Sequence, residues 1–226
     1  MFMTTLEHTN DTRGRANATT LCYYAVGMSE LHMHQISVSS MDNNCYLLSA
    51  EGEGLLIDAA DDAPALLEMA RRAGVRITKV LTTHRHKDHT RALPEVLEAT
   101  GATHYAPFLD APALPSPVDV ELHHGDTIVH AGHELPVTIL RGHTPGGAAV
   151  SATFGGYTHL FVGDSLFPGG LGKTTSESDF ARLYKDVTTR IFDVYEDSAL
   201  VHPGHGAATM LGEERPHLQV WWERRW

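Results

Sequence analysis

Three histidines and one aspartate fall within six positions of the chain, at His84, His86, Asp88 and His89. Imidazole and carboxylate are ligands that zinc accepts, and iron and manganese accept them too. Residues 76–81 are rich in apolar and β-branched types and predict a buried strand that ends just before this group. His84 and His86 can then point to one position, and Asp88 and His89 to a second position nearby. This density favours two neighbouring metal sites over a run of solvated loop histidines.

Three later segments each offer one more ligand directly after an apolar strand. His143 lies in a glycine-rich turn, where the backbone can approach a bound ion closely. Asp164 follows a second strand-like segment, and His205 follows a third. Because one loop cannot close two sites, these segments supply the ligands that residues 84–89 lack.

The elements that must position these loops follow from hydrophobic periodicity and turn signals. Four prolines within residues 107–117 predict a connecting loop beside the site. The Ser176–Asp179 pattern predicts a capped helix start. Predicted strands are 34–38, 44–48, 54–57, 76–81, 103–106, 118–122, 127–130, 136–140, 148–153, 159–162 and 200–201. Predicted helices are 61–73, 93–99, 176–195 and 212–226.

The motifs T-H-x-H-x-D-H, G-H-T, G-D and G-H-G occur in this order and together resemble those of the metallo-β-lactamase superfamily, over roughly residues 33–215. The resemblance implies a metallo-β-lactamase fold, an α/β (α+β) four-layer αββα sandwich. It implies two divalent metal ions, zinc first, with iron or manganese as alternatives. The implied ligands are His84, His86 and His143 for the first ion, Asp88, His89 and His205 for the second, and Asp164 as a bridge between them.

The resemblance also implies the chemistry. In the family a water or hydroxide lies between the two ions, and each cation lowers the pKa of bound water from ~15.7 toward ~7. The second ion can then stabilise an oxyanion or a leaving group. Asp88 and Asp164 would be the catalytic carboxylates. Asp58 has two interpretations, a buttress of the histidine loop as in the family or an ordinary cap of the helix at 61–73.

One branch of the family is favoured by sequence around two of the ligands. The segments G-D-S-L-F, G-L-G-K and P-G-H-G resemble glyoxalase II, which hydrolyses a hydroxyacyl thioester of glutathione. Lys173 matches the lysine that holds a substrate carboxylate there, with a solvated loop cation as the alternative. Thr175 stands where the branch has tyrosine, and the chain ends at Trp226, shortly after His205. We therefore expect the helical glutathione-binding appendage to be absent, and the acyl carrier to be another small thiol or to be held differently.

The leading hypothesis is thus a two-metal hydrolase acting on an acyl thioester of a small thiol. The alternative is a persulfide dioxygenase with one iron at the positions matching His84, His143 and Asp164. β-Lactam hydrolysis is disfavoured because the bridging Asp164 is present, whereas the lactamase branches generally lack it. A noncatalytic metal-binding protein is disfavoured because all seven ligand positions are intact.

Composition sets the wider limits. The 226 residues suit one layered domain, predicted at 28–226, after a polar, aperiodic extension at 1–27 that we expect to be disordered. The net charge of −11 argues against a nucleic-acid partner and favours a small-molecule substrate. With two cysteines, no secretory signal and no stretch of ~18 apolar residues, we expect a cytoplasmic protein without a membrane span. His123, His124, His130 and His133 are expected on the surface. The sequence gives no prediction of the oligomeric state.

Overall fold

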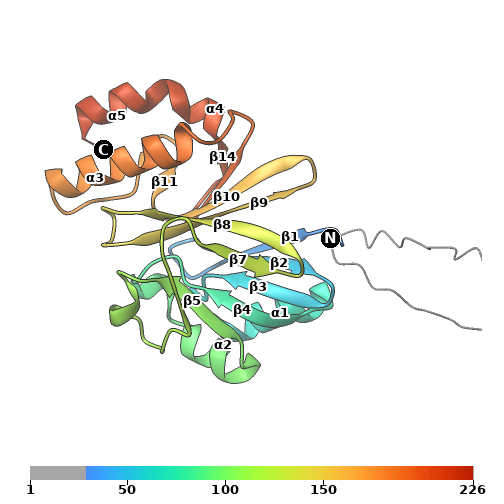
Figure 1. Cartoon of the computed structure of the whole chain (residues 1–226). Coiled ribbons are helices and arrows are strands. Elements are labelled where there is room, and N and C mark those ends of the chain that lie inside the picture. The colour runs from blue at the N-terminus through green and yellow to red at the C-terminus, as the bar shows by residue number, and fades with distance from the viewer. Residues whose placement is uncertain (1–28, 226) are drawn as a thin grey trace, which may run out of the picture.

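Two six-stranded sheets pack face to face and carry helices on both outer faces in this computed structural model, which describes residues 29–225 (Figure 1). The first sheet has the order β1 (His32–Val38), β2 (Asn43–Ala50), β3 (Glu53–Ile57), β4 (Arg76–Leu81), β5 (Thr103–Pro107) and β6 (Val120–Leu122). The second has the order β14 (Thr209–Met210), β13 (Leu200–Pro203), β10 (Tyr157–Gly163), β9 (Gly147–Phe154), β8 (His133–Leu140) and β7 (Thr127–His130). The predicted four-layer αββα sandwich is confirmed.

Helices of each half cover their own sheet (Figure 1). The first half holds α1 (Ala63–Ala73) and α2 (Leu93–Thr100), with short 3₁₀ turns at Lys87–His89 and Ala111–Ala113. The second half holds α3 (Glu177–Val187), α4 (Leu211–Glu214) and α5 (Leu218–Arg224), with the small hairpin β11 (Leu166–Phe167) and β12 (Gly170–Leu171). The extension predicted at residues 1–27 lies outside the described residues, and a domain beginning at residue 28 stays a prediction.

Strand β2 shows why the layers form. All of its residues are buried, and successive side chains alternate between two cores. Tyr46 and Leu48 pack between the two sheets, whereas Cys45 and Leu47 pack under the first-half helices. A third core, which includes Trp221, lies between the second sheet and its helices. A strand that is apolar on both faces can be satisfied only as an inner layer.

Parallel pairing brings the candidate ligands to one edge. Strands β3, β4 and β5 pair in parallel in the first sheet, and β10 pairs in parallel with β13 in the second. The carboxyl ends of parallel strands share an edge of the sheet. The loop after β4 therefore opens beside the end of β3, and Asp164 after β10 lies near His205 after β13.

Two helix predictions need correction. The helix predicted at 176–195 begins as expected, with Ser176 accepting from the Asp179 N–H, but changes into a π-helical turn at Thr188–Phe192. Hydroxyls of Thr188 and Thr189 donate to carbonyls one turn back and compete with regular helix bonding there. The helix predicted at 212–226 is split by a 3₁₀ turn at Arg215–His217, where Pro216 has no N–H to donate.

The prediction that all four hairpin histidines lie on the surface is wrong for His130. This residue is fully buried, and its Nε2 lies 3.0 Å from the Leu48 carbonyl oxygen of the first sheet. His130 shares the inward face of β7 with Ile128, two residues earlier. His123 and His124 are exposed, and His133 is half-buried. Within residues 29–225, no helix has both the length and the apolar character needed to cross a membrane.

Candidate metal centre

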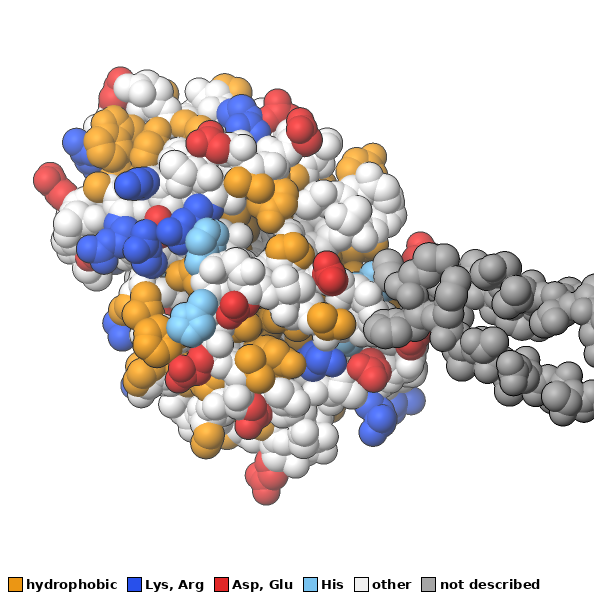
Figure 2. Space-filling model, in the orientation of Figure 1, with side chains coloured by type: hydrophobic (Ala, Val, Ile, Leu, Met, Phe, Trp, Pro, Cys, Tyr) orange, Lys and Arg blue, Asp and Glu red, His pale blue; other side chains and the backbone are white. Residues whose placement is uncertain are grey.

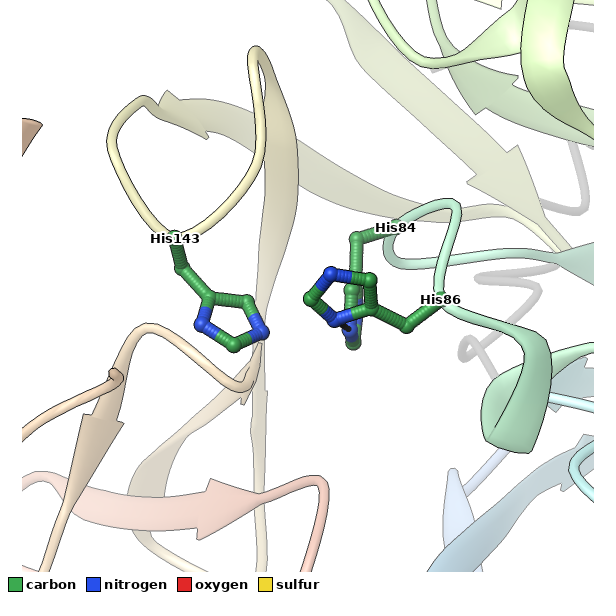
Figure 3. A group of neighbouring side chains, drawn as sticks. All are labelled: His84, His86 and His143. Atoms are coloured by element: carbon green, nitrogen blue, oxygen red, sulfur yellow. Dashed lines mark hydrogen bonds between the residues drawn. The ribbon is translucent and has the colours of Figure 1, made fainter. Parts of the chain in front are cut away.

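The first group of side chains consists of His84, His86 and His143, which face one another from two loops (Figure 3). His84 and His86 follow β4, and His143 lies between β8 and β9. One nitrogen of each ring lies within 4.8 Å of the others. His84 Nε2 and His86 Nδ1 are 3.2 Å apart. The sequence-predicted members of the first site therefore meet in space.

The second group consists of Asp88, His89 and His205. Asp88 and His89 lie in the 3₁₀ turn after the first two histidines, and His205 comes from the loop after β13. His205 Nε2 lies 3.1 Å from His89 Nε2 and 3.2 Å from Asp88 Oδ2. His89 Nε2 is 3.6 Å from that same oxygen. The predicted members of the second site also meet.

Asp164 lies between the two groups. Its Oδ2 is 3.6 Å from His143 Nε2 and 4.0 Å from His84 Nε2, both in the first group. The same oxygen is 3.4 Å from His205 Nε2, and Oδ1 is 3.3 Å from His89 Nε2, both in the second group. This placement is the one that a bridging carboxylate would require.

In three of the histidines, the ring nitrogen that points away from the site, Nδ1, donates a hydrogen bond to an oxygen. His205 Nδ1 donates to the Met41 carbonyl at 2.8 Å, and His143 Nδ1 donates to the Lys173 carbonyl at 2.7 Å. His89 Nδ1 donates to Asp58 Oδ2 at 2.8 Å. A neutral imidazole, the form that binds a metal, carries one N–H, so the inward Nε2 of each ring would then offer a lone pair.

The Nδ1 atom of His84 is held in the same way, with the Thr83 hydroxyl as its acceptor. The Thr83 hydroxyl donates to Asp58 Oδ2 at 2.7 Å, so its oxygen can accept from His84 Nδ1 at 3.0 Å. Asp58 also accepts from the Thr83 N–H, while the helix α1 is capped by Asp62. The structure thus favours the buttress interpretation of Asp58 over the capping one.

Facing lone pairs and carboxylate oxygens are the arrangement that a cation satisfies. Zinc lies about 2.0–2.2 Å from its nitrogen and oxygen ligands, so two ligands of a tetrahedral site are about 3.3 Å apart. The separations of 3.1, 3.2 and 3.6 Å within the second group bracket this value. His143 Nε2 and Asp164 Oδ1 are buried polar atoms without a hydrogen-bond partner among the described residues. The residues present therefore fit divalent cations.

Electrostatics also favour positive charge here. Burial raises the pKa of Asp164, but the close approach of His205 and His89 outweighs it and holds that pKa far below its usual range. Burial lowers the pKa of His89, but Asp58 and Asp164 outweigh it and raise that pKa to about 10. Burial, followed by the neighbouring His89, holds the pKa of His84 well below normal. The second group and the bridge attract a cation, and His84 stays neutral as a ligand must.

Two supporting residues escaped sequence reasoning. Asp110 is fully buried and accepts from the Arg85 N–H at 3.0 Å and from the Gly146 N–H at 3.1 Å. It therefore ties the loop of His84 and His86 to the loop of His143. Asn43, at the start of β2, donates to Asp88 Oδ2 at 3.1 Å. No spacing signal in the sequence links either residue to the ligands, apart from the prediction that the proline-rich loop lies near the site.

Lys173 is exposed, and its carbonyl rather than its ammonium group contacts the site, through His143. Two glycines allow the close packing around Asp164. A Cβ at Gly172 would overlap the Asp164 carbonyl oxygen, and a Cβ at Gly204 would overlap Asp164 Oδ1. The G-L-G-K and G-H-G motifs therefore need glycine for space as well as for their turns.

Comparisons with known proteins agree with this geometry. The family model described as the Metallo-beta-lactamase superfamily matches residues 41–209. The hydroxyacylglutathione hydrolase of Fuscovulum blasticum is 40% identical over 134 residues, which is 58% of this chain and 51% of that protein. This chain spans about half the length of the curated relatives that it matches.

Two solved structures have similar folds. ETHE1 from Myxococcus xanthus aligns with a TM-score of 0.73 at 26% identity, covering 85% of this chain and 85% of that one. The protein TTHA1623, solved in a di-iron-bound form, aligns with a TM-score of 0.66 at 28% identity, covering 80% of this chain and 96% of that one.

Proposed function

Because the chain belongs to the metallo-beta-lactamase superfamily, we propose that it is a two-metal hydrolase that cleaves an acyl thioester of a small thiol. The likeness to proteins named hydroxyacylglutathione hydrolase supports this reaction class. The observation that carries the proposal is Asp164, whose two oxygens face both groups of inward lone pairs at 3.3–4.0 Å. We assign the two ion positions to the groups defined above, with Asp164 shared, and name zinc as the first candidate.

Bound divalent cations would lower the pKa of water, supply hydroxide near neutral pH and stabilise an oxyanion. The chain itself orients the histidine rings that would hold these cations. The Asp58 carboxylate and the Lys173 carbonyl fix the tautomers of His89 and His143, which keeps both Nε2 lone pairs directed inward.

The remaining steps balance as a hydrolysis. Water oxygen bonds to the thioester carbon, the C–S bond breaks with its electron pair going to sulfur, and the thiol and the acid leave with the two protons of water. The Asp88 carboxylate is less buried than that of Asp164, at 17% and 11% exposure, and is placed to receive the proton that water releases. Lys173 is exposed and its backbone carbonyl lies on His143, so we assign its ammonium group to capture of a substrate carboxylate.

One face of the molecule carries a local gathering of positive charge. Figure 2 shows Lys and Arg side chains gathered at the left of the view, below the position of α3 in Figure 1. This gathering occurs although the chain as a whole carries a net charge of −11. Local positive charge raises the encounter rate with a small anion.

The direct test is thiol release from S-lactoylglutathione and a panel of other S-acyl thiols, with metal content measured in the same preparation. We expect turnover of at least one thioester and two divalent ions per chain. Metal-replete protein that turns over no thioester would eliminate the hydrolase. A nitrocefin assay on the same sample tests β-lactam hydrolysis, for which we expect no activity.

A second candidate function is a mononuclear-iron persulfide dioxygenase. The observation that favours it is the 2-His-1-carboxylate set His84, His143 and Asp164, a ligand combination typical of non-haem iron oxygenases. Asp164 Oδ2 lies 4.0 and 3.6 Å from the two Nε2 atoms. One iron per chain together with oxygen uptake on a persulfide would select this function over hydrolysis.

A further inference from the structure

Asn43 is a fully buried amide at the start of β2 that reaches the second group. Its Nδ2 donates to Asp88 Oδ2 at 3.1 Å and lies 3.4 Å from His205 Nε2. The backbones of Asn43 and His205 also form an isolated antiparallel bridge. One side chain of β2 therefore contacts ligand candidates from two separate loops.

The orientation of this amide is fixed by the turn before it. The Met41 N–H donates to Ser39 Oγ at 3.0 Å, and the Ser39 hydroxyl donates to Asn43 Oδ1 at 2.6 Å. Ser39 and Asp42 both have positive φ, at 64° and 54°, which makes the turn tight enough for this contact. Because the oxygen of the amide already accepts from Ser39, its NH₂ group must face Asp88.

Asp88 needs such a partner more than the other ligand candidates do. It lies between the exposed Lys87 and the buried His89, and is only partly buried itself. The first-group rings are held from elsewhere, His84 by Thr83 and His143 by the Lys173 carbonyl. In the second group, His89 is held by Asp58 and His205 by the Met41 carbonyl. Loss of the Asn43 amide would therefore free Asp88 and leave the first group in place.

We propose that Asn43 is a positioning residue that sets the affinity of the second ion site, and with it the choice between a two-ion and a one-ion protein. This inference rests on the proposed two-metal function. Partners that orient metal ligands typically contribute 10- to 100-fold in affinity. Removing Asn43 is thus expected to lower the affinity of the second site by that factor and to leave the affinity of the first site unchanged.

The test is equilibrium dialysis of metal-free protein against a buffered zinc series, with bound metal counted by mass spectrometry. At a free zinc level where the wild-type protein holds two ions, we expect Asn43→Ala to hold one, with the second affinity reduced by about 10- to 100-fold. Ser39→Ala, which keeps the amide but removes the hydroxyl that orients it, should weaken the second site by less. Cobalt substitution adds a spectroscopic readout, because the absorption band of the first site should persist in both variants.

Thr78→Ala is the matched control. The Thr78 hydroxyl, near the start of β4, donates to Glu53 Oε2 at 3.3 Å, and among the hydrogen bonds of residues 29–225 it makes none to a ligand side chain. This variant should hold two ions with wild-type affinity. Thermal unfolding of each metal-free variant shows whether the fold is intact.

Several outcomes would overturn the inference while leaving the proposed function standing. Asn43→Ala that keeps both ions at wild-type affinity would remove the positioning role. Asn43→Ala that loses both ions together with a lowered apo melting temperature would show a general structural role. A wild-type protein that never takes up a second ion would overturn the proposed two-metal function as well, and that failure is visible without any variant.

Discussion

Asp164 is the residue on which the two ion positions depend, since its Oδ2 lies near His143 of the first group and His205 of the second, while its Oδ1 lies near His89 of the second. Gly172 and Gly204 pack against Asp164 so closely that neither position leaves room for a side chain. A negative charge at this point offsets repulsion between two neighbouring cations. This role depends on the charge of one side chain, so a single substitution can test it.

We predict that Asp164→Asn, which keeps the shape and removes the charge, weakens binding of both ions and lowers thioester turnover by at least about 100-fold. Metal content by mass spectrometry and thiol release measure the two effects. The exposed Asp193→Asn is the control and should behave as wild type. Retention of both ions by Asp164→Asn would contradict a bridging role.

Lys173 permits a sharper prediction about substrate chemistry. If its ammonium group pairs with a substrate carboxylate, Lys173→Ala should raise KM for a carboxylate-bearing thioester about tenfold, equivalent to about 1.4 kcal/mol. KM for a neutral acyl thiol should stay unchanged. Kinetics on a matched pair of substrates measure the difference, with the exposed Lys87→Ala as control. Equal effects on both substrates would assign Lys173 to the solvated loop cation interpretation.

At the scale of elements, the parallel pair β10–β13 carries Asp164 and His205 and contains a buried histidine pair. His159 Nδ1 lies 2.9 Å from His202 Nε2, and the two rings are stacked with centroids 5.2 Å apart. His202 also stacks on Phe161. Burial, with a smaller contribution from His159, lowers the pKa of His202 to about 4, and burial lowers the pKa of His159.

This pair predicts a pH dependence of stability. Between pH 6.5 and about 4, His202 binds a proton in the unfolded chain but stays neutral in the folded state. Stability is therefore fully present above pH 6.5 and falls toward pH 4, by roughly 3 kcal/mol for His202 alone. Urea unfolding of wild type and His202→Phe at pH 5 and pH 7 measures the difference, and the variant should lose less on acidification. The exposed His217→Gln is the control, and equal pH slopes for wild type and His202→Phe would contradict the prediction.

At the scale of the whole molecule, the seven candidate ligands come from both sheets, so bound cations would cross-link the two halves. A ligand that binds only the folded state stabilises it by RT ln(1 + [L]/Kd), about 2.7 kcal/mol per site at 100 Kd. We predict that chelation lowers the melting temperature and that zinc restores it. Calorimetry with and without a chelator measures the shift. An unchanged melting temperature would mean that the loops hold no cation in the folded protein.

The sequence by itself determined the layers and the ligand candidates. The apolar run along β2 and the helical spacing in α3 report which residues are buried, and residue types after successive strands report which side chains can bind metal. These signals are local, because each depends on residues close together in the chain.

Only the tertiary structure decided how the ligands are held. Asn43 reaches Asp88 and His205 across 45 and 162 positions of the chain, and Asp110 joins two loops that share no sequence signal. The Met41 and Lys173 carbonyls fix ring tautomers through backbone atoms, which are the same for every residue type and so leave no mark in the sequence. His130 is buried because its strand packs against the opposite sheet. Such long-range contacts exist only after the two sheets have come together.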